Sequence, residues 1–190
     1  MRKVYKALLL FVFIGMKTSY ALPIQFEVNG ISLQETNQIK SQLSIERFNQ
    51  YAQQSLAKLT IIVLKSKQEI RAFLAQRGYF QAHVHSTIST SKDQKFWAVN
   101  FKVTPGVQTK YQLIDIRATG PGSHDKSLIY WINEHRPKYD SAYNARIYQQ
   151  LKSSLVDLAK FLGYFDAHYS VHQIAINAKT HKAQLKLILL

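Results

Sequence analysis

The sequence predicts an α+β protein built from two tandem copies of one small module. The hexapeptide Gly78-Tyr79-Phe80-Gln81-Ala82-His83 recurs as Gly163-Tyr164-Phe165-Asp166-Ala167-His168, at an offset of 85 residues, which suits a small domain better than a solenoid repeat. Each copy follows a segment with helical hydrophobic spacing and precedes an alternating segment, so the structural context repeats as well. With 46% hydrophobic and 19% charged residues among 190, the chain has the composition of a globular protein.

Residues 1–21 have the pattern of a secretory signal peptide. Three cations precede an apolar run from Ala7 to Gly15, and Ser19-Tyr20-Ala21 places small residues at a cleavage site. The run is too short for a transmembrane helix, which needs about 20 apolar residues. We therefore expect an exported protein with a cleaved signal at 1–21 and two domains at 22–106 and 107–190.

The charge is positive and evenly spread. The net charge of +14 falls to +10 without residues 1–21, and each expected domain carries +5. Nucleic-acid-binding proteins cluster their cations on one helix or groove, so we expect no nucleic-acid partner. Anionic lipid headgroups or acidic unfolded polypeptides are the acidic partners to expect after export. The chain has no cysteine, which excludes disulfides and thiol catalysis.

The first module begins with a strand and a short helix. Residues 24–28 alternate apolar and polar side chains, which is typical of a half-buried strand, and Asn29-Gly30 forms a turn. Ser32 and Glu35 have the spacing of a capping box, so a helix begins at about Ser32.

A longer helix follows and ends at Gly78, which supplies a left-handed C-terminal cap. Ile61, Ile62 and Leu64 lie off its main stripe and predict a helix buried on more than one side. The main stripe consists of Leu56, Leu59, Val63, Ile70 and Leu74.

Two alternating segments complete the module as a hairpin. Strand two runs from about Gln81 to Ile88, and a polar turn near Ser91 leads to strand three. Thr104-Pro105-Gly106 ends the module, because proline interrupts a central ladder. The inward side chains of strand three are Trp97, Val99, Phe101 and Val103.

The second module repeats this order. A strand containing Ile114 and Ile116 precedes a short helix from about Asp125 to His135, and a second helix ends at Gly163. The buried stripe of that helix is Ile147, Leu151, Leu155, Leu158 and Leu162. The inner face of strand two is Ala167, Tyr169 and Val171, and that of strand three is Ala183, Leu185, Leu187 and Leu189.

Each module therefore reads β-α-α-β-β, a three-stranded mixed sheet covered on one face by two helices. The third strands are the most apolar segments, as a central strand should be. Strands one and two are then the edges, and an uncovered edge presents unpaired amides and carbonyls to another extended chain.

A secreted, tandem β-α-α-β-β module with Gly-Tyr-Phe before strand two resembles the polypeptide-transport-associated (POTRA) domain. More narrowly, the chain resembles the periplasmic half of the TamA family of outer-membrane assembly factors. The stretches that carry this resemblance are Lys102 to Val107, Leu151 to Leu155, Leu158-Ala159 and Gly163 to Ala167.

The resemblance implies a role in translocation and assembly of autotransporters and other β-barrel proteins. It implies unfolded outer-membrane proteins and a TamB-like, inner-membrane-anchored protein as partners. Members of that family continue into a third POTRA domain and a barrel, which this sequence lacks, so a truncated protein is expected. The alternative is an exported basic module that binds anionic lipid or acidic polymer and has no assembly role.

Catalysis and metal binding have little support in the sequence. The pairs His83/His85 and His168/His172 are each expected on one strand face, where two ligands are conceivable, but no nearby carboxylate supports them. No nucleophile has an evident base. We expect no enzyme activity, no catalytic residue, no cofactor and no metal site. The four aromatics of the repeated motif are expected in the core and not in a ligand-stacking box: Tyr79, Phe80, Tyr164 and Phe165.

Strand two of each module is the candidate client-binding edge, at residues 81–88 and 166–174. A client strand that adds to such an edge gains backbone hydrogen bonds that tolerate many sequences. An edge blunted by charge or covered by the neighbouring module is the alternative. The candidate residues are Gln81, His83, His85, Thr87, Asp166, His168, Ser170 and His172.

Overall fold

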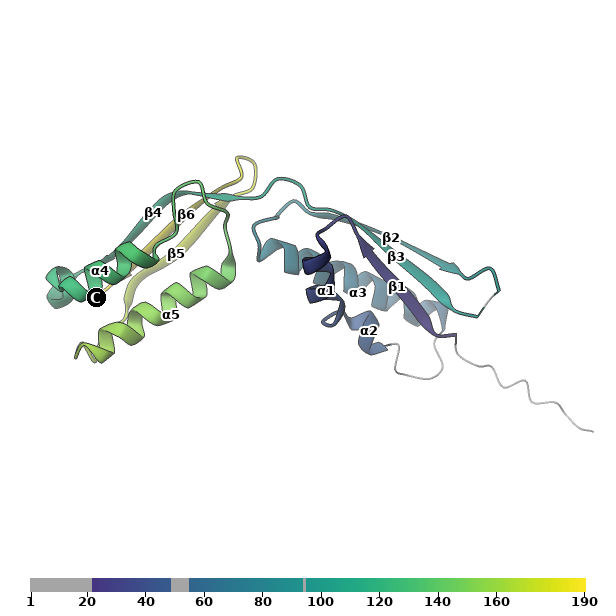
Figure 1. Ribbon diagram of the computed structural model, residues 1–190, viewed down its shortest axis with the longest axis horizontal. Helices are drawn as coiled ribbons and strands as arrows, with labels where there is room; N and C mark the ends of the chain where they lie inside the picture. Colours follow the sequence, from purple (N-terminus) through teal and green to yellow (C-terminus); the bar gives the residue numbers. More distant parts are fainter. Residues whose placement is uncertain (1–21, 49–54, 94) are drawn as a thin grey trace, which may run out of the picture.

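A computed structural model describes residues 22–48, 55–93 and 95–190. The expected signal peptide lies outside these residues. The chain forms two modules arranged end to end, and in each the helices cover one face of a three-stranded sheet (Figure 1). The α+β class and the two mixed sheets expected from the sequence are confirmed.

The first module contains β1, three helices and a hairpin (Figure 1). Its elements are β1 (Ile24–Asn29), α1 (Leu33–Lys40), α2 (Ser44–Phe48), α3 (Leu56–Ala75), β2 (His83–Thr90) and β3 (Trp97–Thr104). Ser32 caps α1 and forms the expected capping box with Glu35. Sequence analysis missed α2 as a separate helix.

The second module repeats the strand order, with a 3₁₀ turn and two helices between its first strand and its hairpin. Its elements are β4 (Lys110–Ala118), η1 (Gly120–His124), α4 (Lys126–His135), α5 (Ala145–Phe161), β5 (Tyr169–Asn177) and β6 (Lys182–Leu189). Asp125 caps α4 through hydrogen bonds that its carboxylate accepts from the amides of Ser127 and Leu128.

The strand orders are β1-β3-β2 and β4-β6-β5. The central strand pairs in parallel with the first strand and antiparallel with the second in both sheets. The predicted central position of the third strands is therefore confirmed. Their inward residues, other than Trp97, are at most 3% exposed: Val99, Phe101, Val103, Ala183, Leu185, Leu187 and Leu189.

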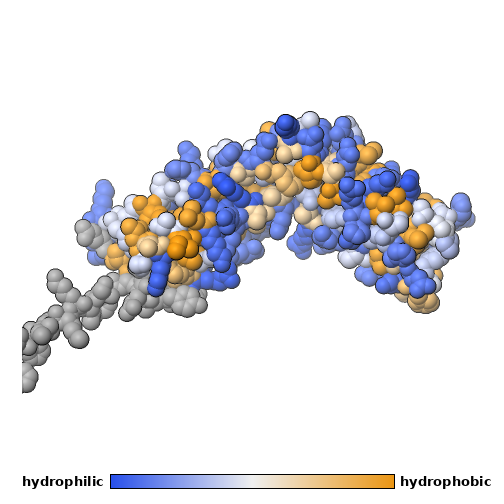
Figure 2. Space-filling view, turned by 180° about the vertical axis from the view of Figure 1, so that it is seen from behind, coloured by the Kyte–Doolittle hydropathy of each residue, from blue (hydrophilic) through white to orange (hydrophobic). Residues whose placement is uncertain are grey.

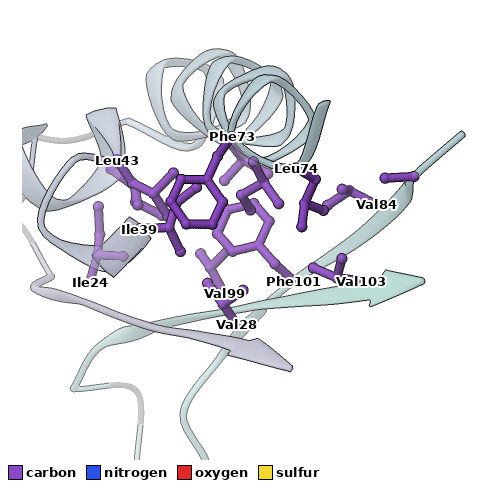
Figure 3. Packing of buried hydrophobic residues seen from close by; sticks show 14 of the residues in the cluster. Ile24, Val28, Ile39, Leu43, Phe73, Leu74, Val84, Val99, Phe101 and Val103 are labelled. Carbon is purple, nitrogen blue, oxygen red and sulfur yellow. The ribbon is translucent and has the colours of Figure 1, made fainter. Parts of the chain in front are cut away.

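The core of the first module lies between its sheet and α3. Phe101 projects from β3 toward Phe73 and Leu74 of α3, while Ile39 and Leu43 approach from the α1 side (Figure 3). Full burial of a large apolar side chain stabilises a fold by about 1.5–3 kcal/mol. These contacts fix the sheet beneath the helices and leave its edges at the periphery.

Both long helices end in the same way, as the repeated glycines predict. Gly78 and Gly163 have φ values of +91° and +98°, which other residues adopt at a cost. The next amide, of Tyr79 or Tyr164, donates back to Leu74 or Ala159 at 3.0 Å. This closes the last turn of each helix.

Three expectations about helix faces are wrong. Ile61 and Leu64 of α3 are 65% and 54% exposed, so α3 is buried on one side only. Leu56 and Ile147 were assigned to buried stripes, yet both are exposed. They lie in the first turns of α3 and α5, where the helix has passed the edge of the core.

The two modules contact one another through the end of α3. Gly78 O accepts from the amide of Thr109 at 2.9 Å, and Gln76 O accepts from the amide of Ala145 at 2.8 Å. The amide of the Gln108 side chain donates to Arg77 O at 2.8 Å. Backbone and side-chain hydrogen bonds therefore join the residues that directly follow α3 to two segments of the second module.

Candidate binding edges

The outer side of β2 is an edge of the first sheet. β2 pairs with β3 alone over eight residues, in an uninterrupted antiparallel register from His83↔Thr104 to Thr90↔Trp97. The amide of Trp97 donates to Pro23 O on the β1 side, so Thr90 is not hydrogen-bonded to it. Because bonded and non-bonded pairs alternate in such a ladder, four residues direct their amides away from β3: Val84, Ser86, Ile88 and Thr90.

Three of the four candidate residues in the first module lie on β2 as expected. His83, His85 and Thr87 are exposed on the face opposite the helices, where they neighbour Thr104, Lys102 and Asn100. Gln81 precedes the strand, and its side chain donates to Ala178 O in the second module at 3.0 Å. Gln81 therefore belongs to the contact between modules.

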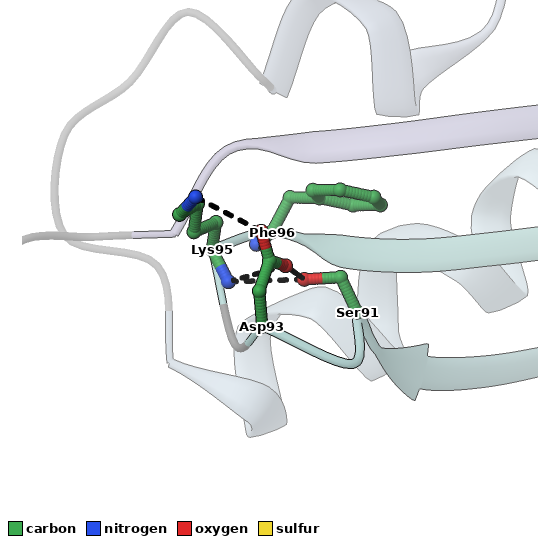
Figure 4. Close-up of polar contacts among 4 residues, drawn as sticks. All are labelled: Ser91, Asp93, Lys95 and Phe96. Carbon is green, nitrogen blue, oxygen red and sulfur yellow. Dashed lines mark hydrogen bonds and ion pairs between the residues drawn. The ribbon is translucent and has the colours of Figure 1, made fainter.

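A compact polar turn lies at the far end of β2 (Figure 4). The Ser91 hydroxyl donates to Asp93 at 2.6 Å and accepts from the amides of Lys95 and Phe96. The Ser91 hydrogen bond, and then the Lys95 ammonium at 3.2 Å, lower the pKa of the Asp93 carboxyl. These bonds hold the hairpin end of β2 in place.

The edge strand of the second module is irregular. The register shifts between Tyr169 and Val171, as at a β-bulge, where one extra residue disturbs the ladder. Val171 pairs with Ile188 and His172 with Leu187, whose side chain is in the core. The expectation that Val171 lies on the inner face is therefore wrong, because the bulge exchanges the faces beyond it.

The same bulge separates His168 from His172. His168 exchanges two backbone hydrogen bonds with Leu190, at 3.1 and 2.8 Å, while His172 lies opposite Leu187. Positions 187 and 190 are on opposite faces of the sheet, since faces alternate along a strand. The prediction that these histidines share a face is wrong.

The remaining candidates lie at or before this bulge. Asp166 and His168 precede β5, which begins at Tyr169. Ser170 is the extra residue, and its hydroxyl donates to Ile188 O at 3.1 Å. The strand thus starts about three residues later than predicted and continues to Asn177.

The two first strands form the other edges. β1 has only six residues. The beginning of β4 is covered by its own module, because the amide of Tyr111 donates to Ser141 O and Tyr111 O accepts from Asp140. Among the described strands, β2 therefore presents a long and regular outer edge.

Only half of the motif aromatics are core residues. Tyr79 and Tyr164 pack at the margins of the cores, and the Tyr164 hydroxyl donates to Asp125 at 3.1 Å. The ring centroids of Phe80 and of Tyr143 in the second module are 5.6 Å apart. Phe165 is 80% exposed, so the expectation of a core position is wrong for both phenylalanines.

The described residues contain no cluster of three or more histidine, cysteine or acidic side chains with metal-binding geometry. Within those residues, no helix has the length and apolar character of a membrane span. Figure 2 shows hydrophobic patches interspersed with hydrophilic residues over both modules.

Residues 25–106, a little under half of the chain, match the POTRA family model, described as surface antigen variable number repeat. The chain is similar to POTRA domains 3–5 of BamA from Haemophilus influenzae at 20% identity, with a TM-score of 0.35, over 90% of this chain and 61% of that one. It is similar to POTRA domains 1–2 of the periplasmic domain of Omp85 from Anabaena at 14% identity, with a TM-score of 0.40, over 88% and 93% of the two chains.

CdiB from Escherichia coli is similar at 12% identity, with a TM-score of 0.36. This chain covers 94% of its own length and 29% of CdiB in that comparison, so it spans less than two thirds of CdiB and of the BamA fragment. The family-model match supports a POTRA domain at residues 25–106, and the second module repeats the strand order of the first.

Proposed function

We propose that this chain is a tandem POTRA scaffold of an Omp85-type outer-membrane assembly protein, and that it binds unfolded barrel proteins in the periplasm. The observation that carries the proposal is the regular, outward-facing edge of β2. A client strand would add to this edge through backbone hydrogen bonds, with little dependence on client sequence.

The first module is the principal binding module in this proposal. Its edge strand has eight paired residues without a register shift, whereas β5 carries a bulge near its start. Bulges twist an edge and disfavour strand addition. Polar side chains flank the β2 edge on the outer face, so the backbone offers most of the recognition.

The test uses the full chain with a photo-crosslinking residue in place of Thr87. The probe is a β-barrel polypeptide unfolded in urea. Ser86→Pro removes an outward amide without removing a bond to β3. We expect this variant to lose most of the crosslinking while its circular dichroism and unfolding midpoint stay close to those of the parent chain.

His172→Pro is the matched change on the β5 edge. His172 lies opposite Leu187 and also directs its amide away from the neighbouring strand. We expect a much smaller loss of crosslinking from it. Undiminished crosslinking in Ser86→Pro, with the fold intact, would exclude β2 as the client edge.

The finer assignment is to the TamA type, with a TamB-like partner anchored in the inner membrane. Its support is the sequence resemblance at the Thr104-Pro105-Gly106 junction and along residues 151–167. Affinity capture from a detergent-solubilised cell-envelope extract, with the Ser86→Pro variant in parallel, tests it. Recovery of barrel proteins without a TamB-like protein would contradict this finer assignment.

A further inference from the structure

The outer face of α3 combines two exposed aliphatic side chains with free cations. At about 100° per residue, Ile61 and Leu64 lie on the side of the helix opposite its buried residues Leu59, Ser66 and Ile70. They are 65% and 54% exposed. Because α3 covers one face of its sheet (Figure 1), the side of the helix opposite its buried residues points away from the sheet.

Cations flank this apolar line on both sides. By the same helical geometry, Lys58 and Lys65 lie on one flank of Ile61 and Leu64, and Arg71 lies on the other. All three are exposed, and none forms an ion pair with another described residue. The cations are therefore available to an external anion.

The only carboxylate of α3 is directed elsewhere. Glu69 accepts hydrogen bonds from the amide of Ser44, at 2.7 Å, and from the Ser44 hydroxyl. It is thus occupied at the start of α2 and does not neutralise the outer face. The central line of that face is uncharged: Ala57, Ile61, Leu64, Gln68 and Ala72.

We infer that this face of α3, defined by Lys58, Ile61, Leu64, Lys65 and Arg71, binds an anionic phospholipid bilayer surface. Helices that lie in a membrane interface have apolar residues in the centre of one face and Lys or Arg beside them. The aliphatic side chains would enter the headgroup boundary, and the cations would meet lipid phosphates. The inference goes beyond the proposed client edge, because it concerns another surface of the first module.

The experiment uses the absence of cysteine from the chain. Ile61→Cys in the full chain is labelled with an environment-sensitive fluorophore and mixed with vesicles of phosphatidylglycerol and phosphatidylcholine. The readout is local, so vesicle binding by other parts of the chain does not produce it. We expect a blue shift at position 61, and none at Leu113→Cys on β4, where the side chain is 54% exposed against 65% for Ile61.

Removing one cation from this face of α3 should lower the vesicle partition of the labelled chain about fivefold. Lys58→Gln combined with Lys65→Gln is therefore expected to lower it more than tenfold. Lys102→Gln with Lys186→Gln makes the same charge change on the sheet faces opposite the helices and is expected to leave the blue shift at position 61 unchanged. Vesicles of phosphatidylcholine alone are expected to give no blue shift.

Three outcomes would overturn the inference. These are a blue shift of equal size with neutral vesicles, an unchanged shift after loss of the two lysines, and a response to polyglutamate but not to vesicles. The last would identify an acidic polypeptide as the occupant. Failure of client crosslinking leaves this surface unaffected, because β2 and α3 are probed by different ligands.

Discussion

Gly78 and Gly163 occupy equivalent positions in the repeat but have different surroundings. A Cβ atom added to Gly78 would lie 3.1 Å from Tyr143 O and 3.2 Å from Thr109 O, whereas nothing lies within 4 Å of one added to Gly163. Both have positive φ. The close approach at Gly78 therefore comes from the second module and not from the helix cap.

This difference predicts unequal effects of one substitution. Gly163→Ala should cost about 1–2 kcal/mol, the usual penalty for a left-handed residue with a Cβ atom. Gly78→Ala should cost clearly more, because two carbonyls must also move. Urea unfolding followed by the fluorescence of Trp97 and Trp131, one in each module, measures both losses. Equal losses would contradict the proposed close packing at Gly78.

A tyrosine cluster makes the second module sensitive to alkali. Burial is the main cause that raises the pKa of Tyr111 to about 12 and raises the pKa of Tyr143, Tyr148 and Tyr169. The folded state therefore holds these hydroxyl protons more tightly than the unfolded state, in which the pKa of a tyrosine side chain is about 10. The contribution of Tyr111 to stability is therefore present below pH 10 and is lost between about pH 10 and 12, and the raised pKa values of the other three tyrosines add a loss in the same direction as the pH rises.

We expect the free energy of unfolding of the second module to fall by up to about 1.4 kcal/mol per pH unit for each such group in that range. Unfolding followed by Trp131 fluorescence at several pH values measures the slope. Tyr111→Phe removes one titrating hydroxyl and should reduce the slope of unfolding free energy against pH. An identical slope in that variant would show that Tyr111 does not contribute.

At the scale of elements, α2 depends on two polar contacts from α3. Glu69 binds the amide and hydroxyl of Ser44, and the buried Ser66 hydroxyl accepts from the amide of Ile45 at 3.2 Å. A hydrogen bond to a charged group contributes about 1.5–3 kcal/mol. These bonds satisfy amides at the start of a helix of five residues, which would be marginal alone.

Glu69→Ala should therefore lower the free energy of unfolding of the first module by about 2 kcal/mol. It should also allow α2 to unfold locally, because the helix loses its contacts at Ser44. Hydrogen exchange at the amides of Ser44 and Ile45 should accelerate more than exchange in β3. Glu46→Ala, at an exposed position of α2, is the control and should have a small effect. Slow exchange retained at Ser44 in Glu69→Ala would contradict the role of this carboxylate.

Periodicity and caps predicted most elements, because strands with apolar residues on alternate positions and helices ending at Gly78 and Gly163 carry local signals. The bulge at Ser170 could not be predicted, since it depends on how β5 pairs with β6. The exposed positions of Ile61 and Phe165 also escaped prediction. Hydrophobicity indicates that a side chain gains from burial but does not identify the surface that covers it.

At the scale of the whole molecule, the repeated motif serves two different purposes. In the first copy, Phe80 lies against Tyr143 and Gln81 binds Ala178 O, so the motif joins the modules. In the second copy, Phe165 is 80% exposed. The junction also holds the start of β2 against the second module, so its rigidity determines how the client edge is presented.

Phe80→Ala should loosen this junction, because it removes the aromatic contact with Tyr143 and leaves the hydrogen bonds and the packing at Gly78 to hold the modules together. Labels at Thr60→Cys and Ser153→Cys, one on the long helix of each module, report the distance between modules by electron paramagnetic resonance. We expect a broader distance distribution in Phe80→Ala and the parent distribution in Phe165→Ala, the same change 85 residues later. A distribution that is unchanged in Phe80→Ala, or equally broadened in both, would show that this ring does not fix the arrangement of the modules.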